Sequence, residues 1–168
     1  MGSTENLRSG EAIKKIQELA EAANTCLFTT NLTKIPLSAR PMSTSKIEDD
    51  GSMWFFSRVD SDKNTDIKQD NRVQLFYANT GSSEFLSIYG TAEISTDPAK
   101  IEELWTPLAK TWFTEGKEDP AITLIKVTPE DGHYWDTKSG KIVSLLKIAV
   151  GAVIGKTMDD GLEGKVRI

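Results

Sequence analysis

The sequence is poor in the residues that form covalent links or hold metal ions. Among 168 residues there is one cysteine, Cys26, and one histidine, His133. A single cysteine excludes an intrachain disulfide, and the apolar stretch around Cys26 predicts a buried strand rather than a reactive thiol. His133 has no cysteine or histidine neighbours at metal-ligand spacing, so we expect no metal site and interpret it as an ordinary strand or turn residue.

The sequence also lacks a hydrophobic run long enough to cross a membrane. Its most apolar stretch, residues 142–154, is interrupted by Ser144 and Lys147 and falls short of the roughly 20 residues that a spanning helix needs. We interpret it as a docking helix and expect no membrane span. Residues 1–10 carry no apolar signal core, so we expect a flexible N-terminus over residues 1–8 and a cytoplasmic location.

Positive charge is in deficit. The formal net charge is -5 and the isoelectric point is near 5.0, whereas non-specific nucleic-acid affinity depends on clustered lysine and arginine. Nucleic acid is therefore not an expected partner.

With 38% hydrophobic and 27% charged residues, the composition is that of one globular domain. We place this domain at residues 9–155, including the apolar helix, and expect a polar tail over residues 156–168.

Three common catalytic motifs are absent as well. There is no Gly-x-Ser-x-Gly elbow, no P-loop lysine and no Gly-x-Gly-x-x-Gly turn. The sequence therefore lacks the motifs that usually indicate a hydrolase, a nucleoside triphosphatase or a dinucleotide-binding fold. The sequence assigns no side chain as a catalytic acid or base, and it leaves the small-molecule substrate open.

The chain does contain clear helical patterns. Apolar residues at helical spacing predict an amphipathic helix over residues 11–23, with Ser9 as its N-cap. Asp97 followed by Pro98 is a typical helix start, and it predicts a second helix over residues 99–110. The polar stretch 61–71, in which Ile67 is the one apolar residue, fits a short helix.

β-Branched and aromatic residues predict most of the remaining elements. The expected strands cover residues 25–32, 36–47, 52–58, 72–77, 85–95, 122–127 and 133–135. Asp50-Gly51 predicts a hairpin turn, Asp131-Gly132 a second turn, and Gly90 a bulge or a close backbone approach. Short turns between the early strands favour antiparallel pairing over a parallel βαβ arrangement. We therefore expect an α+β fold, a small antiparallel barrel of about six strands with flanking helices.

Several short segments carry a family resemblance through their order along the chain. They are Arg40-Pro41-Met42-Ser43, Trp54-Phe55-Phe56-Ser57-Arg58, Asp62-Lys63 and Gln74. Over roughly residues 10–140 the sequence resembles the FMN-binding split barrels of the pyridoxamine phosphate oxidase-like family, most closely the general stress protein branch. The resemblance implies that the expected barrel is a split barrel.

The resemblance also implies a cofactor site. It places the flavin phosphate on Arg40 and Lys63, since arginine offers a planar fork and lysine a compact charge to phosphate oxygens. Backbone groups of Pro41 and Met42 would face the polar edge of the flavin ring. Phe56 and Ser57 would line the ring and the ribityl-phosphate arm, Gln74 would reach the pyrimidine side, and Trp112 or Trp135 would cover a ring face. A solvated strand arginine, a surface lysine, an outward glutamine and core phenylalanines are the plain structural alternatives.

The expected assembly and activity follow from the same resemblance. A small barrel walls one side of a flavin ring, so a homodimer with FMN at its interface is expected, with FAD as the alternative cofactor. Ser87 and Tyr89 would reach the cofactor of the second subunit. The implied function is a flavin-dependent oxidoreductase linked to stress response. The alternatives are a non-catalytic flavin-binding or sensing module and an interaction protein that uses the apolar helix 142–154. Asp62-Lys63 departs from the Arg-Lys pair of the oxidase itself, so the resemblance does not extend to pyridoxamine phosphate oxidation.

Overall fold

A computed structural model describes residues 3–5, 7–137 and 161–167 of the chain. The four helices of this part are α1 (Ser9–Ala23), α2 (Asp62–Gln69), α3 (Pro98–Leu104) and α4 (Ala109–Trp112). Its strands are β1 (Ser3–Thr4), β2 (Leu7–Arg8), β3 (Thr25–Thr30), β4 (Ser38–Ser43), β5 (Lys46–Ile47), β6 (Met53–Arg58), β7 (Arg72–Asn79), β8 (Glu84–Ser95), β9 (Ile122–Thr137) and β10 (Gly161–Arg167).

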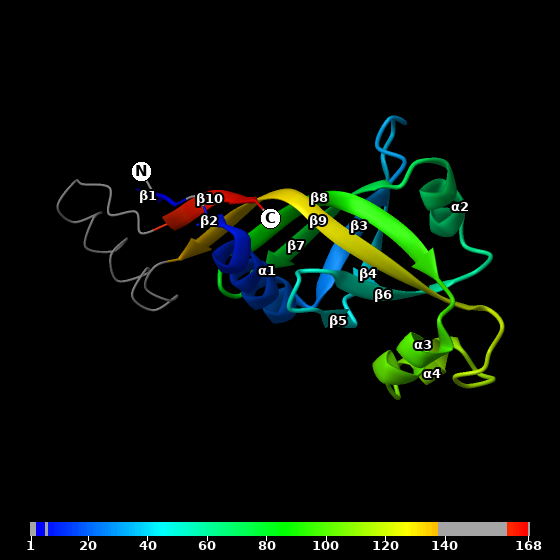
Figure 1. The fold of residues 1–168 in the computed structure, drawn as a ribbon. Coiled ribbons are helices and arrows are strands. Elements are labelled where there is room, and N and C mark those ends of the chain that lie inside the picture. Colours follow the sequence, from blue (N-terminus) through cyan, green and yellow to red (C-terminus); the bar gives the residue numbers. More distant parts are fainter. Residues whose placement is uncertain (1–2, 6, 138–160, 168) are drawn as a thin grey trace.

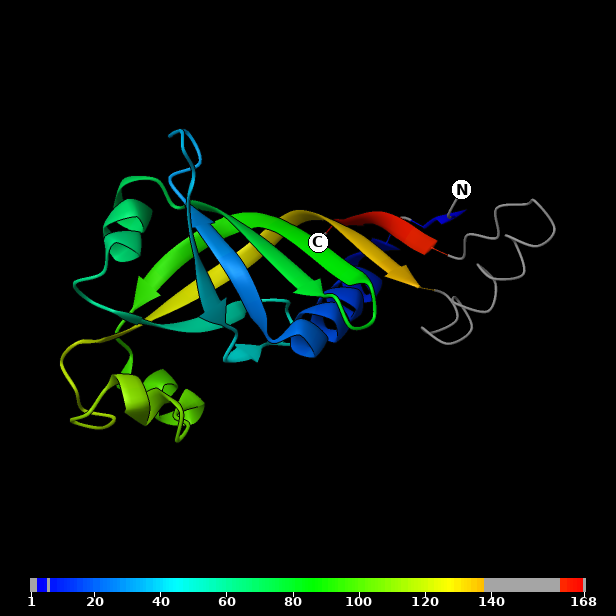
Figure 2. The ribbon, with the colours of Figure 1, turned by 180° about the vertical axis from the view of Figure 1, so that it is seen from behind.

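Six of these strands form a curved antiparallel sheet, shown from two sides in Figures 1 and 2. They pair in the order β4-β3-β7-β8-β9-β6. Among the described residues β4 and β6 do not pair with each other, so the barrel is open along that seam. The sheet therefore has the split-barrel arrangement, with few helices, that the sequence predicts.

Strand β9 is shared between two parts of the sheet. Its first half, Ile122–Val127, pairs with β6, and its second half, Asp131–Thr137, pairs with β10. The sequence predicts a turn at Asp131-Gly132, and this is wrong because the strand continues through both residues. Gly132 is needed there for close packing, since a Cβ at this position would lie 2.7 Å from the Ser87 carbonyl oxygen.

Two glycines confirm the other backbone predictions. Gly51 has a φ of 86° in the turn between β5 and β6, as the Asp-Gly step predicts. At Gly90 the pairing of β8 with β9 shifts register, and a Cβ would lie 2.2 Å from the Thr128 carbonyl oxygen. Gly90 is therefore a bulge residue and also a point of close backbone approach.

The main core fills the barrel and is closed at one end by α1. Ile16 and Leu19 of α1 are buried, as the amphipathic pattern predicts, and the Phe28 and Phe55 rings meet edge to face at 5.2 Å in the barrel interior. Arg8 rather than Ser9 occupies the N-cap position of α1. Cys26 is buried on β3, also as predicted.

A second, smaller core lies beneath α3 and α4. The Asp97 side chain accepts a hydrogen bond from the Ala99 N–H and Pro98 begins α3, as predicted. The predicted single helix over residues 99–110 is interrupted after Leu104, because Pro107 disfavours a helical conformation in the residue before it. The strand expected over residues 36–47 likewise divides into β4 and β5.

The two ends of the described chain meet in the sheet. Residues 1–8 are expected to be flexible, yet β1 and β2 pair in parallel with β10, which lies in the expected polar tail. The contact is close, since the Tyr134 hydroxyl donates to the Glu5 carbonyl oxygen at 2.8 Å. The predicted apolar helix 142–154 lies outside the described residues. Within the described residues, no helix has the length and apolar character needed to cross a membrane.

Candidate functional site

Arg40 lies on β4, and its half-buried side chain contacts β3 and α2. Its Nη1 donates to the Thr30 hydroxyl at 2.8 Å and to the Phe28 carbonyl oxygen at 3.2 Å, and its Nη2 donates to the Ser38 hydroxyl at 2.7 Å. The Asp66 carboxylate lies 3.9 Å from Nη2. These contacts leave Nε and one N–H of Nη2 without a hydrogen-bond acceptor among the described residues.

Lys63 lies in the first turn of α2 and is also half-buried. Burial lowers the pKa of its ammonium group, and the nearby Arg40 charge lowers that pKa further, while Asp60 and Asp62 oppose the effect. No described residue forms a hydrogen bond or ion pair with Lys63. Arg40 and Lys63 are thus two cations in electrostatic contact, and a bound anion would relieve their repulsion.

Helix α2 is held in place by a buried polar network on its other side. Ser57 of β6 donates to the Asn64 side-chain oxygen at 2.7 Å, and the Asn64 amide donates to the Thr123 hydroxyl at 2.9 Å. All three side chains are at least 97% buried. Because buried polar groups that are fully paired fix geometry, this network sets the position of the helix that carries Lys63.

The open edge of β4 offers main-chain groups beside Arg40. The Thr44 N–H donates to the Asn24 carbonyl oxygen, and hydrogen-bonded pairs alternate along an antiparallel ladder. By this alternation the main-chain groups of Met42 face β3, whereas those of Pro41 and Ser43 face the open seam. The Met42 side chain is buried in the main core, so Ser43, which the sequence analysis did not select, takes the edge position expected of Met42.

The two β6 residues of the predicted site have structural partners. Phe56 is half-buried and packs against Trp105 and Phe113, with ring centroids 6.1 and 6.0 Å apart. Ser57 belongs to the buried network that anchors α2. The structure therefore places Phe56 in the second core and gives Ser57 a positioning role behind Lys63.

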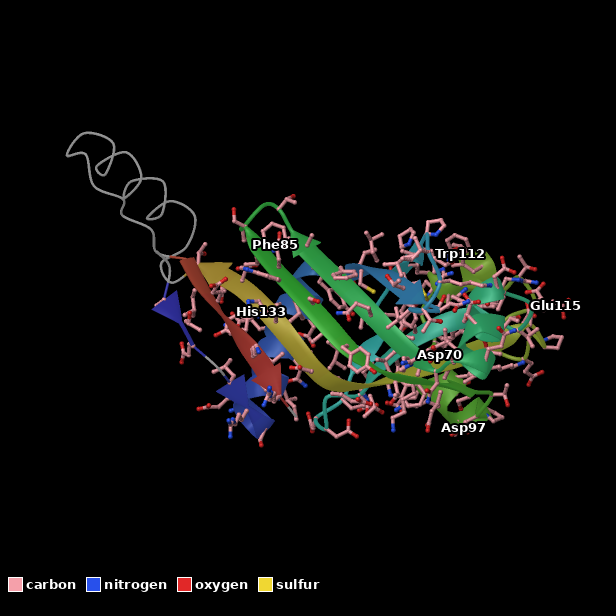
Figure 3. All side chains as sticks on the ribbon, turned by 90° about the horizontal axis from the view of Figure 1, so that it is seen from above. Asp70, Phe85, Asp97, Trp112, Glu115 and His133 are labelled. Atoms are coloured by element: carbon pink, nitrogen blue, oxygen red, sulfur yellow. The ribbon has the colours of Figure 1, made fainter. Side chains whose placement is uncertain are left out.

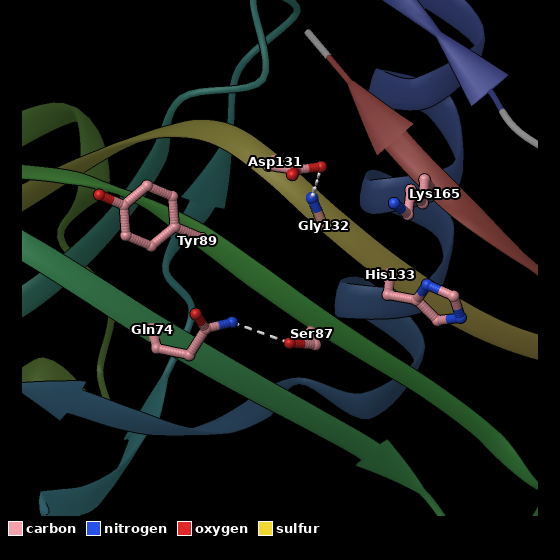
Figure 4. A pocket seen from close by; sticks show the side chains of 7 residues that line it. All are labelled: Gln74, Ser87, Tyr89, Asp131, Gly132, His133 and Lys165. Atoms are coloured by element: carbon pink, nitrogen blue, oxygen red, sulfur yellow. Dashed lines mark hydrogen bonds between the residues drawn. The ribbon is translucent and has the colours of Figure 1, made fainter. Parts of the chain in front are cut away.

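Gln74 lies on the outer face of the sheet rather than beside Arg40. Its amide donates to the Ser87 hydroxyl at 2.8 Å, and both side chains line a shallow hollow of about 240 Å³ (Figure 4). The other lining residues are Tyr89, Asp131, Gly132, His133 and Lys165. The hollow thus brings Gln74, expected at the pyrimidine side of the flavin, together with Ser87 and Tyr89, expected to reach a second subunit's cofactor.

The two tryptophans of the predicted site lie apart. Trp135 borders the same outer face, 41% exposed, with its ring centroid 4.5 Å from that of His133. Trp112, at the end of α4 and 71% exposed, lies at the opposite end of the molecule from His133 and Phe85 (Figure 3). Within the single chain the structure therefore forms two separate groups of site residues, one around Arg40 and one on the outer face.

Comparison with known proteins matches residues 11–159 to the family described as pyridoxamine 5'-phosphate oxidase like. The chain belongs to this family. Protein bli-3 of Neurospora crassa, a curated relative, is 27% identical over 129 residues, and the match covers 71% of this chain and 62% of that protein. The chain therefore spans about three fifths of the length of that relative.

Solved structures of the same family share the fold. A crystal structure from Jannaschia sp. CCS1, assigned to general stress protein 26, has a TM-score of 0.75 at 24% identity and covers 92% of this chain and 99% of its own. The general stress FMN/FAD binding protein of Xanthomonas citri has a TM-score of 0.66 at 28% identity and covers 78% of this chain and 92% of its own. These structures show that the chain has the split-barrel fold.

The family's cofactor can be compared with the donors that the structure shows. Two neighbouring cations, of which Lys63 forms no ion pair with a described residue, suit a phosphate, as does the pair of unused guanidinium N–H groups. The free main-chain groups of β4 suit the alternating donors and acceptors of a flavin ring. The residues present therefore fit a flavin mononucleotide. Sequence reasoning did not select Thr30 and Asp66, which orient Arg40, although the Lys63–Asp66 spacing of three on a helix places both on one face.

Proposed function

We propose that the protein binds FMN in a homodimer and acts as a flavin-dependent oxidoreductase of the stress-response type in the cytoplasm. The observation that carries the proposal is the half-buried Arg40–Lys63 pair, in which Arg40 has unused donors and Lys63 has no hydrogen bond or ion pair with a described residue. In this reading Arg40 binds the phosphate through Nε and Nη2, and Lys63 approaches from α2. When bound, the flavin would supply the electron or hydride transfer, and the chain would bind and orient it.

The homodimer is proposed because exposed apolar side chains surround the outer hollow, where a second copy would complete the flavin site. Leu27, Phe76, Phe85 and Trp135 are exposed there by 52, 44, 38 and 41%, around the hollow that contains Gln74. Exposed apolar side chains gathered on one face are typical of protein interfaces. A second copy on this face would carry its Gln74 and Trp135 toward the other subunit's flavin, which supports the roles expected of them.

Titration of flavin-free protein with FMN, FAD and riboflavin tests the proposal. We expect one FMN per subunit and much weaker riboflavin binding. Arg40→Ala and Lys63→Ala should each weaken FMN binding by about 1.5–3 kcal/mol, the worth of a charge-assisted hydrogen bond. Lys68→Ala removes the same charge from the exposed side of α2 and should leave the affinity unchanged.

Two results would contradict the site. One is an FMN affinity of the Arg40→Ala and Lys63→Ala variants equal to that of the unmodified protein, and the other is riboflavin binding as tight as FMN binding. Turnover is examined separately by reducing the bound flavin with a nicotinamide cofactor and testing for substrate-stimulated reoxidation. A protein that only stores or senses flavin would show no such stimulation.

A further inference from the structure

Arg40 is connected to α2 through one buried hydroxyl group. The Thr30 side chain, at the end of β3, is fully buried. Its Oγ1 lies 2.8 Å from Arg40 Nη1 and 2.6 Å from Asp66 Oδ2. The hydroxyl thus bridges three elements, β4 through Arg40, β3 through its own backbone, and α2 through Asp66.

The hydrogen-bond directions in this bridge are fixed by chemistry. Arginine only donates, and an ionised carboxylate only accepts. The single hydroxyl hydrogen of Thr30 must therefore point to Asp66, and its lone pairs must face Arg40 Nη1. The bridge has one arrangement of protons, so it holds the guanidinium plane in one orientation.

This orientation determines which N–H groups of Arg40 remain available. Nη1 is occupied by Thr30 and by the Phe28 carbonyl oxygen, and Nη2 gives one N–H to Ser38. The unused donors, Nε and one N–H of Nη2, are on neighbouring nitrogens of the same planar group. Two such donors match two oxygens of one phosphate, whereas a freely rotating guanidinium would lose entropy when it formed the same pair of bonds.

We infer that Thr30 is a positioning residue for the phosphate arm of the cofactor, acting on the ligand only through Arg40. The inference rests on the proposed flavin-binding function. It separates phosphate recognition from ring recognition, because Thr30 contacts neither the open edge of β4 nor the outer hollow. Loss of its hydroxyl should therefore lower the affinity for FMN and leave riboflavin binding unchanged.

The test compares variants at two neighbouring threonines. Thr30→Val removes the hydroxyl at constant shape, and Thr30→Ser restores it. Thr29→Val is the matched control, since Thr29 is 1% exposed on the same strand and its hydroxyl forms no hydrogen bond with a described residue. FMN and riboflavin affinities are measured for each variant, together with thermal unfolding of the flavin-free proteins.

We expect Thr30→Val to lower the FMN affinity by about tenfold, and we expect the affinities of Thr30→Ser and Thr29→Val to stay near that of the unmodified protein. In an Arg40→Ala background the Thr30→Val change should have no further effect on FMN affinity, because coupled residues are not additive. Thr30→Ala provides the same measurement if the valine variant does not fold.

The possible outcomes separate this inference from the proposed function. If the unmodified protein binds no FMN, the proposed function and the inference both fail. If it binds FMN but Thr30→Val changes FMN and riboflavin affinities equally, or still weakens FMN binding when Arg40 is absent, only the positioning role of Thr30 is overturned.

Discussion

At the scale of single residues, the site shows charges held close together at a cost to the fold. Burial and the neighbouring Arg40 both lower the pKa of Lys63. Such an arrangement is typical of functional sites, where a group is kept ready for a ligand rather than for stability. Cys26 is the opposite case, because burial raises the pKa of its thiol to about 12 and leaves it as a core side chain.

Lys63→Met should therefore stabilise the flavin-free protein while weakening FMN binding. Between the lowered folded pKa of Lys63 and its unfolded value, the unfolded chain binds more protons, so stability rises with pH in that window. Below both pKa values the cost of the charge is fully present. At pH 7 we expect the free energy of unfolding to rise by about 0.5–2 kcal/mol, measured by urea denaturation.

The control for this prediction is Lys68→Met, which changes an exposed lysine of the same helix. Its unfolding free energy should stay near that of the unmodified protein. A Lys63→Met variant less stable than the unmodified protein at pH 7 would show that Lys63 contributes favourable contacts in the absence of flavin.

At the scale of elements, features that depend on neighbouring residues in the chain were predicted better than features that depend on contacts between elements. The α1 stripe, the Asp97-Pro98 start and the Asp50-Gly51 turn depend on neighbours in the chain, and all three are confirmed. The Asp131-Gly132 step predicts a turn, yet Gly132 lies inside β9 because β8 and β10 pack closely against it. Close packing across strands overrides local turn preference there, and the sequence alone does not show it.

Gly90→Ala should measure how much one such close approach contributes. The new Cβ would lie 2.2 Å from the Thr128 carbonyl oxygen, and this backbone atom cannot rotate away as a side chain could. We expect a loss of more than about 2 kcal/mol in the free energy of unfolding. Gly10→Ala, where the added Cβ meets no atom within 4 Å in the first turn of α1, should instead be neutral or stabilising by up to about 1 kcal/mol.

At the scale of the whole molecule, the proposed cofactor site draws on groups that a single chain holds apart. The Arg40 group and the outer-face group around Gln74 form separate places in the structure. The order of the motifs along the chain, together with the family resemblance, selected members of both groups. This order can be compared with a family even when the distances between the motifs in the folded chain are unknown. It did not select Thr30 and Asp66, whose role depends on β3, β4 and α2 meeting, nor the exposed apolar face, which alternation along single strands does not reveal.

Phe76→Glu should disrupt the proposed dimer and its flavin site together. Phe76 is 44% exposed on the outer face, where a buried carboxylate at an interface would carry a large desolvation cost. We expect the mass measured by light scattering to change from dimer to monomer and the FMN affinity to fall at least about tenfold. Val59→Glu introduces the same charge at another exposed apolar residue (48%) and should change neither. A monomeric unmodified protein that binds FMN with full affinity would contradict the dimer.

The division of β9 between two partners also has a consequence for synthesis on the ribosome. In the part of the chain that the structure describes, strand β6 pairs with the first half of β9 and with β5, which is two residues long. Until Ile122–Val127 has emerged, the nascent chain therefore holds β6 and β8 with unpaired edges, and such edges favour aggregation. The emergence of β9 is therefore the step that covers the edges of both strands.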